Sequence, residues 1–224
     1  MREALMEEVI FLFVYHKLNA LTWRHFTTLQ HWHPRDEIVP LVYRFRGRDV
    51  LPATIDVALD WDYGWPIFSP WHEADKIMLR WYHRPGRPQA RRYVFFEYDI
   101  LANAPASVFY GDAWNADAAA AKLPLPDHAP DWPWFRQGRR LGEYFPHRGG
   151  AVPLGGTLWS DAVLSRIARQ PALQNCFSEL RMATLARHHG FRLQLISGAA
   201  KTVSWRPSDI RVTEEPTWFH PVKA

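Results

Sequence analysis

A continuous apolar run at residues 9–15 constrains the fold of this chain more than any other segment. The run reads Val-Ile-Phe-Leu-Phe-Val-Tyr, which has the length of one strand and is rich in β-branched and aromatic side chains. Such a segment is typical of a strand buried on both faces, as in a parallel sheet. A helical pattern follows and ends before Pro34, and residues 37–45 then form a second apolar strand. The helix is marked by Leu18, Leu21, Leu29 and Trp32.

This strand–helix–strand start predicts an α/β fold, with helices flanking a central, mainly parallel sheet. We expect a single Rossmann-like domain over residues 1–224. Apolar spacing and capping residues predict further elements in the order helix, strand, helix, helix and strand. They are a helix over residues 74–82, a strand over 93–99, a helix capped by Ser160 or Asp161, a helix capped by Ser178 that ends at Gly190, and a strand from Phe191. The connection between residues 111 and 150 is a long ordered excursion rich in Trp and Pro.

Composition excludes several classes of protein. Hydrophobic residues make up 47% of the 224 residues and charged residues 22%, which is the balance of a soluble globular protein. The apolar run near the N-terminus is far shorter than the ~20 residues of a membrane span, and an acidic segment precedes it. The single cysteine, Cys176, allows no disulfide within the chain. We therefore expect a cytoplasmic protein without a transmembrane segment.

Two carboxylates follow the predicted strand over residues 93–99. Glu97 and Asp99 lie two positions apart, so on a strand they point to the same side. Ligands of open α/β sheets collect beyond the carboxyl ends of the strands. Paired carboxylates there suit Mg²⁺ or Mn²⁺, although acidic residues also simply mark where a strand meets water. Asp60 and Asp62 have the same spacing and compete for this role, but they follow a weaker strand pattern and better fit a solvated turn.

Other candidate site residues are weaker when each is considered alone. His220 stands among aromatic residues in Thr-Trp-Phe-His-Pro, which suggests a docked segment that offers an imidazole ligand. Glu179 opens a predicted helix, where the helix dipole favours an acid and where a general base could stand. The glycine pairs at residues 149–150 and 155–156 allow close backbone approach but match no phosphate-binding loop.

Taken in order, these segments resemble a GT-A-type glycosyltransferase of the nucleotide-diphospho-sugar transferase superfamily. The resemblance spans about residues 9–223, and its motifs are short, so it depends on their order. The motifs are VIFLFVYHKLN as first strand and nucleotide loop, WHEADKIMLRWYH as the helix before the metal motif, YVFFEYDI as the strand ending in the DxD-type motif, GGAVPLGGTLWSDAVLSRI as the glycine-rich loop and helix, CFSELRMATLARHHGFRL as the helix with the xED-type motif, and FHPVK as the C-terminal histidine segment. Two motifs depart from the pattern: the metal motif reads Glu-Tyr-Asp, and the xED position carries one acid.

The resemblance implies a role for each matching residue. Asp99, Glu97 and His220 would hold Mn²⁺ or Mg²⁺, and Glu179 would be the catalytic base with Asp161 in reserve. The implied partners are a nucleotide-diphosphate sugar donor and a glycan, lipid-linked or small-molecule acceptor, with peripheral membrane contact possible. The residues implied in nucleotide-sugar binding are Tyr15, Asn19, Asp75, Tyr98, Gly155, Gly156 and Lys223, with Arg92 as a further cation.

Two other functions stay open. A sugar-phosphate nucleotidyltransferase of similar fold would use the same metal, but it favours a glycine-rich basic motif after the first strand, where this chain has Tyr-His-Lys-Leu-Asn. A non-catalytic nucleic-acid-binding module would use a run of arginines together with exposed aromatic residues. Those arginines are Arg80, Arg84, Arg87, Arg91 and Arg92. The acidic strand end argues against nucleic acid as a partner.

Overall fold

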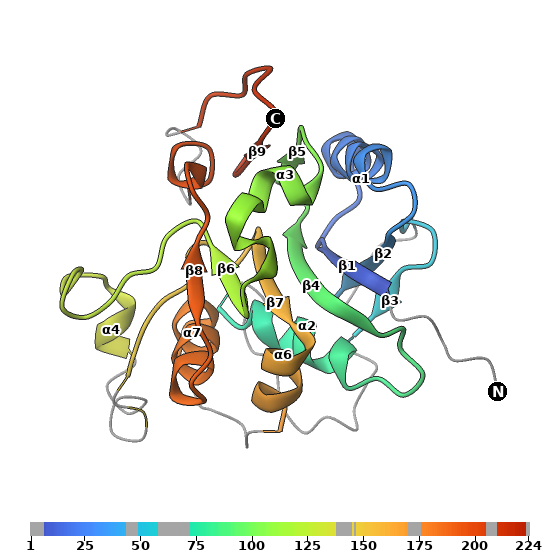
Figure 1. The fold of residues 1–224 in the computed structure, drawn as a ribbon. Coiled ribbons are helices and arrows are strands. Elements are labelled where there is room, and N and C mark those ends of the chain that lie inside the picture. Colours follow the sequence, from blue (N-terminus) through green and yellow to red (C-terminus); the bar gives the residue numbers. More distant parts are fainter. Residues whose placement is uncertain are drawn as a thin grey trace.

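The computed structural model describes residues 7–43, 49–57, 72–137, 145, 147–169, 176–204 and 210–222. These residues form an α/β fold in which helices flank a seven-stranded, mainly parallel sheet with the order β3-β2-β1-β4-β7-β6-β8 (Figure 1). The strands are β1 (Glu7–Val14), β2 (Glu37–Val42), β3 (Ile55–Asp56), β4 (Ala90–Glu97), β6 (Ala118–Ala120), β7 (Thr157–Ser160) and β8 (Leu193–Leu195). Only β7 runs antiparallel to its neighbours, β4 and β6.

Helices cover both faces of this sheet. One face carries α2 (Ala74–Tyr82), α6 (Asp161–Ile167) and α7 (Ser178–His188), and the other carries α1 (Ala20–Trp32) and α3 (Ala106–Tyr110). Short elements complete the chain: η1 (Gly111–Asn115), α4 (Trp134–Gln137), η2 (Ala199–Lys201), and a two-stranded sheet of β5 (Leu101–Ala102) and β9 (Trp218–Phe219). In the described part of the chain, no helix is long and apolar enough to cross a membrane.

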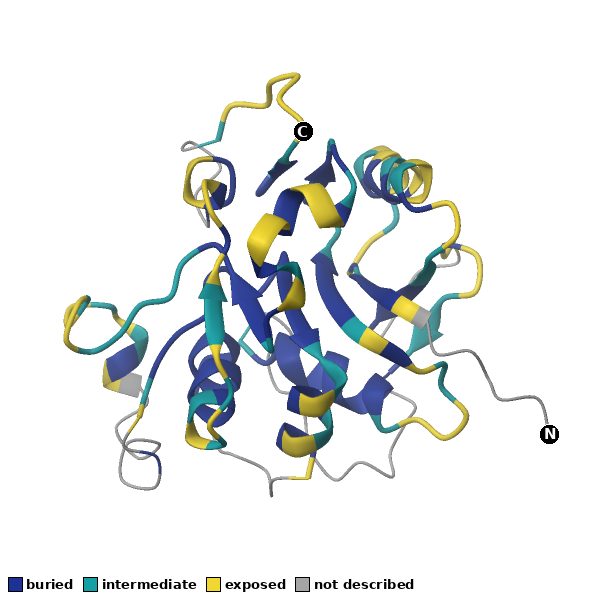
Figure 2. Cartoon of the chain, in the orientation of Figure 1, coloured by how far each residue is buried: buried dark blue, intermediate teal, exposed yellow. Residues whose placement is uncertain are grey.

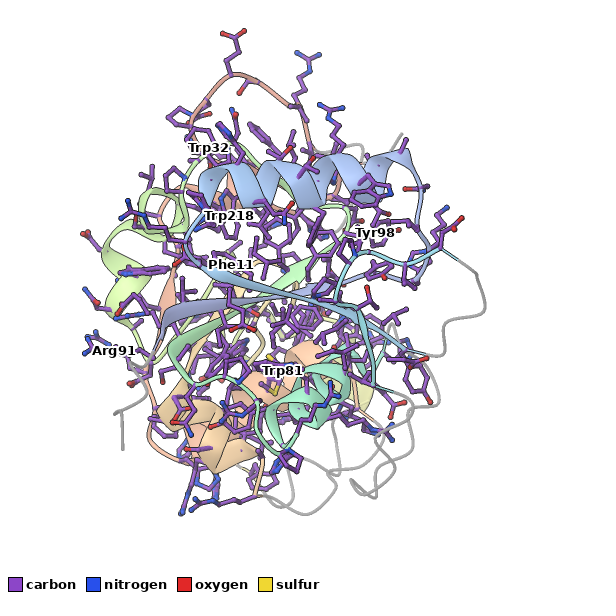
Figure 3. The ribbon with its side chains drawn as sticks, turned by 90° about the vertical axis from the view of Figure 1, so that its right-hand side faces the viewer. Phe11, Trp32, Trp81, Arg91, Tyr98 and Trp218 are labelled. Carbon is purple, nitrogen blue, oxygen red and sulfur yellow. The ribbon has the colours of Figure 1, made fainter. Side chains whose placement is uncertain are left out.

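The apolar run at the N-terminus forms the strand that the sequence predicts. Ile10 and Leu12 pack against α2 and α7, whereas Phe11 and Phe13 pack against α1 and the C-terminal β9. Alternate side chains thus enter two separate hydrophobic cores, because successive residues of a strand point to opposite faces. Figure 3 shows the same division, with Phe11 and Trp218 on one side of the sheet and Trp81 on the other. The middle residues of the central strands β1 and β4 are accordingly buried (Figure 2).

Three helix ends follow the local sequence signals. Asn19 caps α1, since its side-chain oxygen accepts a hydrogen bond from the Thr22 backbone N–H. Ser160 caps α6 in the same way, and Gly190 follows α7 with a φ of +80°. The predicted cap Ser178 is wrong: Ser178 is the first helical residue of α7, and its N–H is bonded to the carbonyl of His72 instead.

Five short strands were not predicted: β3, β5, β6, β7 and β9. The excursion over residues 111–150 contributes β6, made of three alanines, which pairs with β7 on one side and β8 on the other. Alanine has little preference for strands, so β6 exists because its backbone groups are paired on both edges. Strand β7 lies within a segment expected to be loop and helix, and it is only four residues long.

Candidate metal centre and cavity

The carboxyl ends of β1 and β4 define the place of the candidate site. These two parallel strands are neighbours at the sheet centre, where the chain order reverses from β3-β2-β1 to β4. Such a switch point opens a crevice that binds ligands in α/β folds. A cavity of about 470 Å³ lies here, with Val14 and Tyr15 at the end of β1 and Glu97, Tyr98 and Asp99 at the end of β4.

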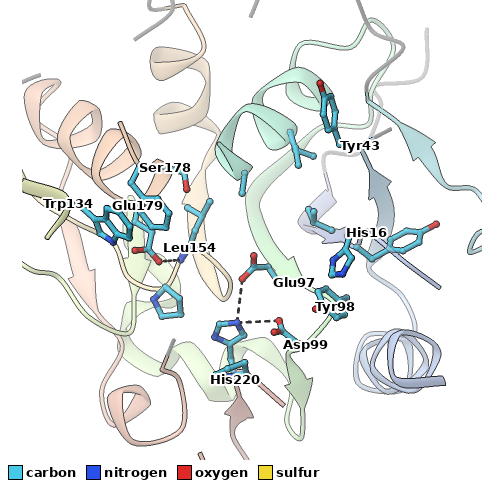
Figure 4. A pocket seen from close by; sticks show the side chains of 17 residues that line it. His16, Tyr43, Glu97, Tyr98, Asp99, Trp134, Leu154, Ser178, Glu179 and His220 are labelled. Carbon is cyan, nitrogen blue, oxygen red and sulfur yellow. Dashed lines mark hydrogen bonds and ion pairs between the residues drawn. The ribbon is translucent and has the colours of Figure 1, made fainter. Parts of the chain in front are cut away.

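Glu97, Asp99 and His220 converge in this cavity (Figure 4). His220 Nε2 lies 3.4 Å from a Glu97 carboxylate oxygen and 3.3 Å from an Asp99 carboxylate oxygen. One ligand atom from each residue lies within 4.8 Å of the other two. The predicted metal ligands are therefore brought together, although β4 ends at Glu97 and Asp99 lies in the turn that follows rather than in the strand.

The C-terminal segment delivers His220 to the acidic strand end. Strand β9 pairs with β5, and the backbone of His220 forms hydrogen bonds with Thr202 and Ser204. The Val222 N–H is bonded to the carbonyl of Asp99 at 2.8 Å, which ties the segment to the β4 turn. His220 is 5% exposed, so the expectation of a docked segment rather than a loose tail is confirmed.

The His220 ring is oriented for coordination through Nε2. Its Nδ1 lies 2.7 Å from the backbone carbonyl of Ser204, which can only accept a hydrogen bond, so Nδ1 carries the proton. Burial alone would lower the pKa of His220. Hydrogen bonds and the charges of Asp99 and Glu97 outweigh that effect and raise the pKa to about 10. Without a metal the ring is thus an imidazolium that balances two carboxylates, and a divalent cation would take the place of its proton.

The surroundings fit a divalent cation on two grounds. A Cβ atom on Gly155 would lie 2.2 Å from a Glu97 carboxylate oxygen, so only glycine leaves room for that carboxylate. The donor set of two carboxylates and one imidazole also suits Mn²⁺, since carboxylates favour Mg²⁺ or Mn²⁺ and imidazole favours transition metals. Gly155 therefore affects the candidate metal site through the position of the Glu97 carboxylate. Gly156, with a φ of +83°, forms the turn into β7 by bonding to Phe95.

Glu179 lies on the same cavity, at the first turn of α7. Its Oε1 accepts a hydrogen bond from the Leu154 N–H at 3.1 Å, so it also anchors the loop that begins at Val152. Burial raises the pKa of Glu179 to about 8. The bond from Leu154 and the charge of His220 oppose the rise, and the charge of Glu97 adds to it. A carboxyl group with a pKa near neutrality can both accept and release a proton, as a general base must.

Several predicted site residues lie elsewhere. Tyr15 and Tyr98 do line the cavity, whereas Asn19 is engaged in capping α1. Both carboxylate oxygens of Asp75 are bound by Arg181, and Asp75 is fully buried, so it is a structural residue of the α2–α7 interface. Lys223 lies outside the described residues, as do Asp60 and Asp62.

Asp161 and Arg92 lie near the opposite end of strand β4 from the cavity. Arg92 pairs with Ser160 and stands five residues before Glu97 on β4, a separation of about 17 Å along a strand. Asp161 accepts hydrogen bonds from the hydroxyls of Tyr82 and Tyr93 there. Neither residue can reach the cavity, so the reserve base and the extra cation were wrong assignments.

The arginine run does not form a single basic face. Arg80 is buried and donates a hydrogen bond to the Val57 carbonyl. Arg87 is packed over the Tyr82 ring at 3.8 Å, and Arg92 is paired with Glu8. Three of the five arginines are thus engaged within the fold, which removes the main support for nucleic-acid binding.

The structure adds candidate site residues that the sequence reasoning missed. His25 lies on the buried face of α1, and its Nδ1 donates a hydrogen bond to the Tyr98 carbonyl at 2.8 Å. This carbonyl belongs to the residue between Glu97 and Asp99. Trp134 and Phe177 stack at 4.1 Å and line the cavity beside Glu179. Helical spacing from Thr22 and Leu29 marks His25 as inward-facing, but its partner is 73 residues away.

Comparisons with known proteins assign this chain to no family. No protein-family model matches the sequence, and no curated protein is similar to it. Among solved structures, one similar chain is described as "Crystal Structure of a Mycobacterial Protein", with 11% sequence identity and a TM-score of 0.46. The alignment covers 82% of this chain and 61% of that protein, so this chain spans less than two thirds of its length. The candidate site must therefore be interpreted from its own geometry.

Proposed function

We propose that this protein is a metal-dependent glycosyltransferase that moves a sugar from a nucleotide-diphosphate sugar to an acceptor hydroxyl. One observation carries the proposal: a Glu97–Asp99–His220 cluster and a buried carboxyl group, Glu179, line the same cavity at the switch point of an α/β sheet. The metal ligands and the base thus come from chain segments that meet only in the fold. The order of motifs that resemble the GT-A family supports the same conclusion.

Each group has a distinct task in this reaction. A bound divalent cation would supply Lewis-acid stabilisation of the negative charge on the leaving diphosphate. Glu97, Asp99 and His220 would hold that cation, and Gly155 leaves space for the Glu97 carboxylate. Tyr15, His16 and Tyr98 line the side of the cavity nearest the end of β1, where the nucleotide would bind.

Glu179 moves the proton in a direct displacement. Its carboxylate accepts the proton of the acceptor hydroxyl while the acceptor oxygen bonds to the anomeric carbon of the donor. The bond from that carbon to the diphosphate breaks, and its electron pair leaves with the nucleotide. The nearby backbone of Leu154 holds Glu179 in place throughout.

A nucleotidyltransferase is less well supported than a glycosyltransferase. Its substrates, a nucleoside triphosphate and a sugar phosphate, carry more negative charge than a diphosphate sugar. None of the described residues lining the cavity is a lysine or arginine, so the site offers little to balance that charge beyond the metal.

The test is thermal stability with nucleoside diphosphates and nucleotide-sugars, each with Mn²⁺ or with EDTA. A ligand at ~100 times its dissociation constant adds about 2.7 kcal/mol to folded-state stability. We expect one nucleotide to stabilise the wild type only with Mn²⁺, and Asp99→Asn to abolish the effect. Asp112→Asn, an exposed acid outside the cavity, is the matched control and should behave as wild type. Equal stabilisation in EDTA, or an unchanged response of Asp99→Asn, would rule out the proposed metal role.

A further inference from the structure

A four-residue turn, residues 154–157, connects the surroundings of Glu179 with those of Glu97. In Figure 4, Leu154 lies between these two carboxylates. The Leu154 N–H donates a hydrogen bond to Glu179 Oε1 at 3.1 Å. The next residue, Gly155, lies so close to Glu97 that a Cβ there would be 2.2 Å from the carboxylate. The proposed base and a proposed metal ligand therefore face one short segment, called here the bridging turn.

Backbone hydrogen bonds hold the bridging turn on the sheet. The Thr157 N–H is bonded to the Leu154 carbonyl at 3.0 Å, which closes the turn. The Gly156 N–H is bonded to the carbonyl of Phe95 in strand β4 at 2.7 Å. On the other side, the Tyr110 hydroxyl donates a hydrogen bond to the Gly156 carbonyl at 2.9 Å. The turn is thus attached both to β4 and to helix α3.

The Thr157 hydroxyl adds a directed hydrogen bond to this turn. Thr157 is fully buried, and its Oγ1 donates to the Leu154 carbonyl at 2.6 Å. The Nε1–H of Trp159, which is also fully buried, donates to the same Oγ1 at 2.8 Å. An indole N–H can only donate, so the proton of the hydroxyl is left to point at the Leu154 carbonyl. Trp159 can reach Oγ1 because residues two apart on a strand face the same side.

Strand β7 therefore supports the bridging turn through a chain of three hydrogen bonds. The first two run from the Trp159 indole to the Thr157 hydroxyl and on to the Leu154 carbonyl. The third runs from the Leu154 N–H to Glu179. The Leu154 carbonyl belongs to the peptide group that joins Leu154 to Gly155. A bond that fixes this group also fixes Gly155, which faces the Glu97 carboxylate.

We propose that Thr157 is a positioning residue that, through the bridging turn, holds Glu97 and Glu179 in place at the cavity. This inference rests on the proposed function, which assigns Glu97 to the metal and Glu179 to the proton transfer. Thr157 is fully buried and does not line the cavity, so it touches no ligand there. It acts on the site indirectly, as do the groups that orient metal ligands in other proteins.

Calorimetric Mn²⁺ titration tests the effect on Glu97. Thr157→Val keeps the shape of the side chain but removes the hydroxyl, and we expect it to weaken Mn²⁺ binding about tenfold. Thr157→Ser keeps the hydroxyl and should restore the affinity to within about threefold of wild type. An affinity of Thr157→Val within that same range, or no recovery in Thr157→Ser, overturns the inference.

Thr184→Val is the matched control. Thr184 is also fully buried, and its Oγ1 accepts a hydrogen bond from the Gly149 N–H and donates one to the Gly149 carbonyl, both at 3.2 Å. This variant should lose stability but bind Mn²⁺ as wild type does, because neither residue lines the cavity. An equal loss of affinity in both valine variants means that Thr157 has only a general structural role. If Thr157→Val does not fold, Tyr110→Phe, which removes the bond to the Gly156 carbonyl, is judged by the same limits.

Urea unfolding at pH 6 in EDTA tests the effect on Glu179. Glu179→Leu removes the acceptor of the Leu154 N–H, and Thr157→Val loosens the turn that presents this N–H. We expect the two changes in the free energy of unfolding not to add in the double variant, because each change weakens the same bond. Additive changes overturn the role of Thr157 toward Glu179.

Neither measurement needs a nucleotide, so the two proposals can fail separately. A wild type that binds Mn²⁺ but no nucleotide contradicts the proposed function and leaves the role of Thr157 to these variants. Metal-dependent nucleotide binding that is combined with an unchanged Mn²⁺ affinity in Thr157→Val overturns the inference alone.

Discussion

His25 Nδ1 donates a hydrogen bond to the backbone carbonyl of Tyr98 at 2.8 Å, which ties helix α1 to the turn between the two acidic ligands. His25 is fully buried, and its Nε2 has no hydrogen-bond partner among the described residues. Burial lowers the pKa of His25 and so keeps the ring neutral, although the Tyr98 bond opposes this effect. A neutral ring with its one proton on Nδ1 is a fixed donor, so we expect His25 to act as a positioning residue for the candidate metal site.

Replacing His25 tests this positioning role. His25→Leu removes the donor and leaves a buried carbonyl unpaired, whereas His25→Asn keeps an N–H donor near the Nδ1 position. We expect His25→Leu to weaken Mn²⁺ binding about tenfold, the lower range for residues that orient metal ligands, and His25→Asn to recover most of it. Calorimetric Mn²⁺ titration gives the affinity.

The control for His25 is another buried histidine near the end of the same helix. His33 bonds to Asp36 and to the Ala106 N–H, away from the cavity. His33→Leu should lower the melting temperature without changing Mn²⁺ affinity. If both leucine variants change Mn²⁺ affinity equally, His25 has only a structural role.

Gly155→Ala should disrupt the metal site sterically. The added Cβ would lie 2.2 Å from the Glu97 carboxylate, so that carboxylate must shift from its position facing His220. We expect at least a tenfold loss of Mn²⁺ affinity in the same titration. Gly149→Ala is the control, because its Cβ would meet the Arg187 side chain at 2.8 Å and strain the fold elsewhere. Unchanged affinity in Gly155→Ala would mean that Glu97 is not a ligand.

Glu179→Gln should change how stability depends on pH. The carboxyl group has a folded-state pKa of about 8 against an ordinary value of 4.5, so between these pH values the folded chain keeps a proton that the unfolded chain has released. The contribution of Glu179 to the free energy of unfolding therefore falls as pH rises through this window. Glutamine does not titrate and preserves the acceptor for the Leu154 N–H.

Urea unfolding in EDTA at pH 5, 6, 7 and 8 measures this effect. We expect Glu179→Gln to gain stability relative to wild type across the series, by on the order of a few kcal/mol in total. A constant difference between the two proteins would show that Glu179 is ionised throughout. The same variant should lose transferase activity, whereas Asp161→Asn, at the far edge of the sheet, should keep it.

Asp75 should be needed for stability but not for nucleotide binding. Asp75→Leu removes the carboxylate that binds the buried Arg181 guanidinium, and breaking such a pair costs about 3–5 kcal/mol. The double variant Asp75→Leu/Arg181→Met removes both charges and should regain most of that stability. Urea unfolding measures the stability of both. If the double variant binds nucleotide with metal about as tightly as wild type does, the role of Asp75 is structural. A tenfold or greater loss of that affinity would indicate that Asp75 takes part in nucleotide binding.

Much of the fold follows from local sequence. The run at residues 9–15 demands burial on both faces, so its place at the sheet centre depends on its own side chains. Ser160 and Gly190 act at helix ends through bonds and backbone angles within a few residues, which is why they were predicted correctly. Asn19, which was expected to bind the nucleotide sugar, caps α1 instead. The acidic residues at the end of β4, Glu97 and Asp99, are also a local feature of the sequence, and they lie at the candidate metal site.

Tertiary structure alone decided which of these features meet. The sequence pattern indicates that Glu97, Asp99, Glu179 and His220 are candidates, and it treats Asp161 in the same way. Only the pairing of β7 with β4 places Asp161 at the end of β4 that lies away from the cavity. Only the pairing of β9 with β5 brings His220 to the carboxylates of Glu97 and Asp99. The alanine strand β6 likewise depends on partners distant in the chain. Local periodicity specifies which side chains need burial, whereas strand partners and their register depend on packing between segments far apart in sequence.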